Sequence, residues 1–183
     1  MRSWRLPIWH DWDVGLLSRS NKDDVDVTSV LSNLDRLNAL EGARIGNHLR
    51  PKLDRLAQTA ARWLNTPMAY MTVLDDHHVY LAGMTGVTGE LAETRTNHAE
   101  ASYCQYVVAT DAVLVVDDST EIALVKNHPA TIDGVRAYLG VPVRYDGQCL
   151  GSFCVVDTKA RDWTDEDLTI LQDLANKAMS ELG

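Results

Sequence analysis

The chain has 183 residues and a net charge of −9, with 45% hydrophobic and 23% charged residues. This length and balance predict one folded domain, because a chain of about 150 residues already buries roughly 70% of its unfolded surface. The negative charge repels phosphate backbones and anionic lipid head groups, and no stretch approaches the roughly 20 apolar residues of a membrane span. We therefore expect a cytoplasmic protein without nucleic-acid or membrane partners.

The first 25 residues form a predicted N-terminal arm, and residues 26–183 form the predicted domain. Tryptophan alternates with proline and aspartate in this arm, at Trp4, Trp9 and Trp12. Exposed tryptophan in a free tail is unfavourable, so we expect the arm to dock on the chain's own domain or on a partner.

Two helices are predicted after the arm. Over residues 28–40 the apolar residues follow helical spacing, and Thr28 or Ser29 is available as the cap. A second helix is predicted over residues 47–64, with Pro51 in its first turn and leucine and alanine along one stripe.

The next segment alternates between strands and a loop. Residues 68–74 and 79–84 are β-rich and predict an antiparallel hairpin. The polar residues 85–99 have little periodicity and predict a long loop, a feature that often serves as a lid. A short helix is predicted over residues 101–109 and a brief buried strand over 113–116.

The C-terminal third has the clearest local signals. Residues 138–145 and 148–156 flank Asp146-Gly147, which predicts a tight hairpin. Thr164 is positioned to cap a last helix whose acidic first turn matches the helix dipole and which runs to the chain end. Five strand candidates between helices predict an α/β (α+β) fold with a central, mainly antiparallel sheet and helices packed on it.

A series of short motifs in order carries a family resemblance. These are ASYCQYVV at 101–108, LVVDDS at 114–119, NHP at 127–129, YLGVPV at 138–143, LGSFCVVD at 150–157 and WTDED at 163–167. The series resembles GAF domains of bacterial sensor kinases and small stand-alone regulators, over about residues 34–182. The resemblance implies a five- to six-stranded sheet with helices on one face and a ligand cup on the other.

The resemblance also implies which residues surround the cup. Its walls would carry Tyr70, Thr72, Tyr80, Tyr138, Val141, Val143, Phe153 and Val155. Its roof would carry Tyr103, Cys104, Val107, Val116, Asp118 and Ile132. Because strand residues point alternately to the two faces and the register is not fixed by sequence, this set is larger than the true lining.

The resemblance leaves the ligand and cofactor open, since members bind cyclic nucleotides, bilins, haem, amino acids or nothing. The motif of cyclic-nucleotide-binding members is absent, and Gln105 follows Cys104 where bilin-attaching members have histidine. The cysteine pattern of the free methionine sulfoxide reductases is also missing.

Cys104 is the strongest candidate for chemistry. Near the start of a short helix, the helix dipole would lower its pKa and favour the thiolate. The alternative is plain packing, because cysteine is among the most buried residue types. The three cysteines are an odd number without metal-ligand spacing, so we expect free thiols.

Other polar groups have competing interpretations. His77 and His78 at a hairpin tip could grip a metal or form a solvated turn, and adjacent strand residues point apart, which favours the turn. Asp117 and Asp118 could act as an acid–base pair or cap the next segment. Arg144, like Arg136, could clamp an acidic ligand, but beside a turn we expect it to face outward.

Three functions follow from these observations. The leading hypothesis is a small-molecule-sensing or signal-relay module that regulates a downstream signalling protein. We expect it to form a homodimer through the apolar stripes of the first and last helices, although packing on the chain's own sheet would use the same residues. The alternatives are a thiol-dependent redox sensor or enzyme that uses Cys104, and a scaffold that captures a partner with the tryptophan arm.

Overall fold

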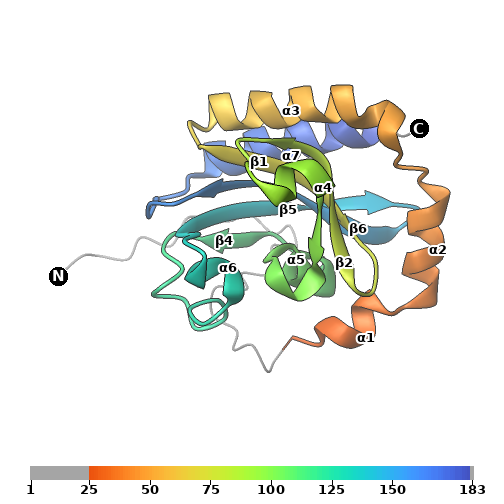
Figure 1. Cartoon of the computed structure of the whole chain (residues 1–183), viewed down its shortest axis with the longest axis horizontal. Coiled ribbons are helices and arrows are strands. Elements are labelled where there is room, and N and C mark those ends of the chain that lie inside the picture. The colour runs from red at the N-terminus through yellow and green to blue at the C-terminus, as the bar shows by residue number, and fades with distance from the viewer. Residues whose placement is uncertain (1–24, 182–183) are drawn as a thin grey trace.

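A single antiparallel sheet organises the chain in the computed structural model, which describes residues 25–181 (Figure 1). Its six strands lie in the order β3-β2-β1-β6-β5-β4, and all neighbours are antiparallel. The strands are β1 (Met68–Leu74), β2 (His78–Thr85), β3 (Thr96–His98), β4 (Leu114–Val116), β5 (Ala137–Tyr145) and β6 (Gln148–Asp157). The predicted α+β fold with a mainly antiparallel sheet of five to six strands is confirmed. The tryptophans of the predicted arm lie outside the described residues.

Both predicted hairpins form. β5 and β6 meet at Asp146 and Gly147, which both have positive φ, at 50° and 73°, as a tight two-residue turn requires. β1 and β2 join through an Asp75 turn, in which one carboxylate oxygen accepts from the backbone N–H groups of His77 and His78. Burial alone would raise the pKa of Asp75, but hydrogen bonds from Tyr80 and these two N–H groups lower it.

Two long helices cover one face of the sheet. α3 (Arg50–Trp63), preceded by the 3₁₀ turn η3 (Asn47–Leu49), and α7 (Asp165–Ser180) lie side by side at the top of Figure 1. A capping box between Thr164 and Asp167 starts α7, as the sequence predicts. The buried stripes of both helices pack on alternate residues of the strands, including Met71, Leu139 and Phe153.

Short elements cover the opposite face. They are η4 (Ala99–Ala101), α5 (Cys104–Thr110), α6 (Pro129–Ile132) and a series of turns between β4 and α6. α1 packs against α5 through Leu31, and a second buried cluster forms between these elements and the sheet. The sheet therefore has one face under long helices and one under short, irregular segments.

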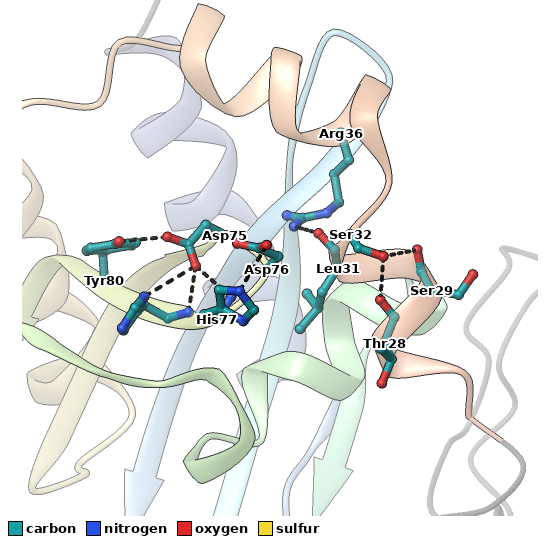
Figure 2. A network of polar contacts seen from close by, with 10 residues as sticks. Thr28, Ser29, Leu31, Ser32, Arg36, Asp75, Asp76, His77 and Tyr80 are labelled. Atoms are coloured by element: carbon teal, nitrogen blue, oxygen red, sulfur yellow. Dashed lines mark hydrogen bonds and ion pairs between the residues drawn. The ribbon is translucent and has the colours of Figure 1, made fainter.

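The helix predicted over residues 28–40 is two helices, α1 (Val27–Leu31) and α2 (Leu34–Gly42). Asp26 caps α1, so the predicted caps Thr28 and Ser29 are wrong, and Asn33 caps α2. The break has a physical reason in Arg36, whose guanidinium turns back over it (Figure 2).

Arg36 fastens this helix pair to the sheet although its side chain is buried. Its Nε donates to the Val30 carbonyl at 3.2 Å, Nη2 to the Leu31 carbonyl at 2.5 Å and Nη1 to the Leu74 carbonyl of β1 at 2.7 Å. Desolvation lowers the pKa of Arg36. The three carbonyls of the helix end and the strand thus share one buried cation.

The long loop predicted over residues 85–99 contains two elements, α4 (Glu90–Thr94) and β3. Arg95 follows α4 in the left-handed region, with φ of 55°, and forms two hydrogen bonds with the Asp54 carboxylate of α3. This partly buried pair holds the segment against α3, so the polar composition reflected specific pairing and not a structureless loop. None of the helices in the described part of the chain is long and apolar enough to cross a membrane.

Candidate functional site

A cavity of about 170 Å³ lies between the sheet and the short segments that cover its second face. Its lining comes from β1 and β2, from α4 and β3, from the η4–α5 corner, and from α6 with the start of β5 and the end of β6. Five of the predicted cup residues line it, namely Tyr70, Thr72, Tyr103, Cys104 and Tyr138. The remaining lining residues are Val79, Leu81, Leu91, Asn97, Ala101, Ser102, Ala130, Asp133, Val135 and Val156. We call this cavity the chamber.

Tyr138 is the centre of a hydrogen-bond chain in the chamber floor. Its hydroxyl lies 3.4 Å from Cys104 Sγ and 3.0 Å from Ser152 Oγ, and both partners are buried. The ring lies over Gly140, where an added Cβ would stand 2.3 Å from the Tyr138 hydroxyl oxygen. Burial raises the pKa of Tyr138 well above its usual value, so the phenol stays protonated.

Cross-strand and roof contacts fix the other polar groups. The Thr72 hydroxyl donates to the Ser152 carbonyl at 3.1 Å, which ties β1 to β6 beneath the chamber. Tyr103 on the roof forms a short hydrogen bond with Thr131 and packs edge-on against Tyr138, with ring centroids 5.5 Å apart. The hydroxyls are thus held in place by both sheet and roof.

Cys104 is the first residue of α5 and is 1% exposed. Its pKa is lowered to about 6, first by a hydrogen bond from the Cys154 thiol and then by the hydroxyls of Ser102, Thr72 and Tyr138, against the opposing effect of burial. The sequence offered a lowering by the helix dipole as one alternative and plain packing as the other, and the causes of the lowering here are side-chain hydrogen bonds. Cys154 in turn has its pKa raised well above the usual value by burial and by Cys104.

This lowered pKa predicts a pH-dependent stability. Between about pH 6 and the ordinary thiol pKa of 9.0, the folded chain has lost the Cys104 proton and the unfolded chain has kept it. Stability then rises with pH, because the unfolded state binds more protons. In urea unfolding, the wild type should gain stability relative to Cys104→Ser from about pH 5 to about pH 8. Cys149→Ser is the control, since burial raises the pKa of Cys149 to about 12. A flat difference across this range would contradict the assignment.

Nine predicted cup residues lie elsewhere. Val141, Val143, Phe153 and Val155 pack under α3 and α7, on the opposite face of the sheet. Their placement in the cup was wrong, because strand alternation assigns them to the face opposite Tyr138 and Cys154.

Five more predicted cup residues do not line the chamber, namely Val107, Val116, Tyr80, Asp118 and Ile132. Val107 and Val116 lie in the core beside the chamber. Tyr80 points outward and donates to Asp75, which raises the pKa of Tyr80 to about 12. Asp118 accepts two hydrogen bonds from Arg136, which lower its pKa to about 2, and Ile132 is 77% exposed. None of these five lines the chamber.

Several lining residues were not predicted. Asp133 follows α6, Ser102 precedes α5, and Asn97 belongs to β3, a strand that the sequence did not indicate. Val156 lies directly after the predicted wall residue Val155 and faces the opposite side of the sheet. The Asp75-Asp76-His77-His78 tip forms a turn as expected, and the described residues contain no cluster of metal-ligating side chains.

A larger hollow of about 350 Å³ lies outside the chamber, near the start of α3 and along β2. Its lining includes Arg50 and Arg95, and Arg95 is already paired with Asp54. Because this hollow shares only Leu81 with the chamber and contains none of the hydrogen-bond chain around Tyr138, we regard the chamber as the candidate site.

The family model of the GAF domain matches residues 48–182, and the chain belongs to this family. No curated protein matches the chain. The type II free methionine-R-sulfoxide reductase of Thermoplasma acidophilum is similar in structure, with a TM-score of 0.62 and 16% identity over 75% of this chain and 94% of that chain.

Two further solved structures share the fold. The GAF domain of a phosphoenolpyruvate-protein phosphotransferase from Coxiella burnetii has a TM-score of 0.62 and 14% identity over 89% of this chain and 95% of that chain. The PixJ GAF domain of Thermosynechococcus elongatus has a TM-score of 0.58 and 18% identity over 82% and 88%. At these identities the likeness shows the fold alone.

Proposed function

We propose that this GAF domain is a sensing module that binds a small molecule in the chamber and passes the signal to a partner protein. The observation that carries this proposal is the chamber itself, which holds ordered hydroxyls on the sheet face that α3 and α7 leave free. Sites of this kind are concave and mostly apolar, with a few placed polar groups.

The lining favours a particular class of ligand. A volume of about 170 Å³ is below the 300 Å³ or more of drug-sized sites, so the ligand has few heavy atoms. The lining residues in the described part of the chain include no lysine, arginine or histidine, and Asp133 is the carboxylate among them. A phosphate or carboxylate would find no cation there, so we infer a neutral or cationic ligand.

Passing the signal to a partner requires a contact on the outer surface of the domain. The inward stripe of the last helix, α7, is buried against the sheet, whereas Leu34 of the first predicted helix is 73% exposed, so a homodimer would use the surface around Leu34. The three cysteines are free, which suits the reducing cytoplasm in which we place the module. The mass of the native protein in solution tests the homodimer.

Thermal unfolding with a panel of small metabolites tests the ligand proposal. A ligand present at a hundredfold excess over its Kd stabilises the folded state by about 2.7 kcal/mol. For a chain of this size we expect the Tm to rise by roughly 5–10 °C with neutral or cationic compounds and to stay unchanged with anionic ones.

A substitution that fills part of the chamber, with a matched substitution elsewhere, tests where the ligand binds. Ala130→Leu places a larger side chain in the lining, whereas Ala160→Leu makes the same change at an exposed position. The Tm response should disappear in Ala130→Leu and persist in Ala160→Leu. A panel without any stabilising compound, or a response retained in Ala130→Leu, would refute binding in the chamber.

A further inference from the structure

Two buried cysteines from distant parts of the chain meet behind the chamber. Cys104 begins α5 and Cys154 lies in the middle of β6, and both are buried in the cluster that also contains Tyr138. The Tyr138 hydroxyl lies 3.4 Å from Cys104 Sγ and close over Gly140, the residue that pairs with Cys154 between β5 and β6. Of the pair, Cys104 lines the chamber and Cys154 does not. A molecule that enters the chamber therefore meets Cys104 first.

The third cysteine has no such partner. Cys149 lies near the start of β6, and its thiol faces the carbonyls of Gly151 at 3.5 Å and Val107 at 3.9 Å. Carbonyl neighbours accept hydrogen bonds and favour the protonated thiol. Cys149 is thus an internal control, since it is also buried but burial raises its pKa to about 12.

We propose that Cys104 and Cys154 are a redox pair, in which a small hydroperoxide entering the chamber oxidises Cys104 and Cys154 then closes a disulfide. This proposal is independent of the sensed ligand, because it needs access to the chamber and nothing else from that site.

The two steps balance without a cofactor. The Cys104 thiolate attacks the terminal oxygen of the hydroperoxide and becomes a sulfenic acid, while the O–O bond breaks and the alkoxide or hydroxide leaves with a proton from solvent. The Cys154 sulfur then attacks Cys104 Sγ, the S–O bond breaks, and the Cys154 proton leaves with the hydroxide as water. Two thiols are oxidised to one disulfide and the peroxide is reduced.

The surroundings of Cys104 suit the first step. The lowered pKa of Cys104 favours the thiolate at neutral pH, whereas an ordinary cysteine is only a few per cent ionised. The neighbouring hydroxyls of Ser102, Thr72 and Tyr138 lower the pKa of Cys104, and a hydroperoxide has only a few heavy atoms and fits the chamber volume. Cys154 keeps its proton until the second step.

Hydrogen peroxide added in slight excess to the reduced full chain tests the pair. We expect the intact mass to fall by two hydrogen atoms and peptide mapping without reductant to link Cys104 with Cys154. Cys149→Ser should behave like the wild type. Cys154→Ser should stop at a Cys104 sulfenic acid that dimedone traps, and Cys104→Ser should react at least about tenfold more slowly.

Circular dichroism of each variant separates loss of chemistry from loss of fold. If Cys104→Ser does not fold, trapping in Cys154→Ser still identifies the residue that is attacked. A disulfide that includes Cys149, dimedone on Cys149 instead of Cys104, or a wild type as slow as Cys104→Ser would each overturn the proposal.

Discussion

Gly151→Ala should destabilise the domain by about 4 kcal/mol or more, the range in which single substitutions are exceptional. Gly151 lies in β6, the strand between β1 and β5, opposite Val73 and Val143. A Cβ at this position would stand 1.8 Å from the Thr72 carbonyl oxygen and 2.8 Å from Val73 Cα. Because both neighbours are backbone atoms of a paired strand, relief requires β1 and β6 to separate. Urea unfolding followed by circular dichroism measures the loss.

Gly89→Ala is the control for this substitution. Gly89 has a φ of 68° and a ψ of −154°, a region that favours glycine, and nothing lies within 4 Å of its added Cβ, so the change adds backbone strain of about 1–3 kcal/mol without a clash. If Gly151→Ala does not accumulate as folded protein, the yield of soluble protein compared with Gly89→Ala gives the same ranking. Equal stability of the two variants would show that the strands can shift to accept the methyl group.

Arg36→Met should cost about 2 kcal/mol or more, because the buried carbonyl oxygens of Leu31 and Leu74 lose this donor together and each unsatisfied group costs about 1–3 kcal/mol. Methionine keeps the apolar stem but cannot donate to Val30, Leu31 or Leu74. The loss should be local as well as global, since Arg36 joins α1 and α2 to β1. Hydrogen exchange should therefore accelerate in α1 and α2 before the sheet.

Arg62→Met provides the comparison, since Arg62 is exposed on α3 and surface substitutions stay within about 0.5 kcal/mol. Arg36→Lys keeps the charge with a shorter reach and should fall between the two. A stability of Arg36→Met equal to that of Arg62→Met would mean that water replaces the guanidinium at these carbonyls.

Local chemistry explains which elements could be predicted. Asp146-Gly147 and Thr164 each specify a turn or cap within a few residues, and both hairpins and the last helix were predicted within about three residues at each boundary. The break at Ser32 was missed because its cause, Arg36 bonded to Leu74, depends on a contact distant in sequence. β3 was missed for a similar reason, since Arg95 is held by Asp54 of α3.

The chamber was harder to predict than the fold. The resemblance identified Tyr103, Cys104 and Tyr138, but it could not choose between alternate residues of β5 and β6. A shift of one residue moves every side chain to the other face, which is how Phe153 and Val155 entered the predicted walls. Asp133 carries no signal of its own beyond its position after a short helix.

The alternation of side chains along β5 and β6, which the sequence alone could not resolve, also connects the two faces of the sheet. Cys154 lies under the chamber and its neighbours Phe153 and Val155 lie under α3 and α7, just as Tyr138 and Leu139 face opposite ways. Only the single sheet therefore separates the chamber from α3 and α7. Tightly packed layers of this kind switch between discrete arrangements and do not deform continuously. A movement of Tyr138 that tilts β5 would change the packing of α7 on β5 directly. Ligand binding in the chamber would then alter the outer surface formed by α7 without any hinge or domain motion.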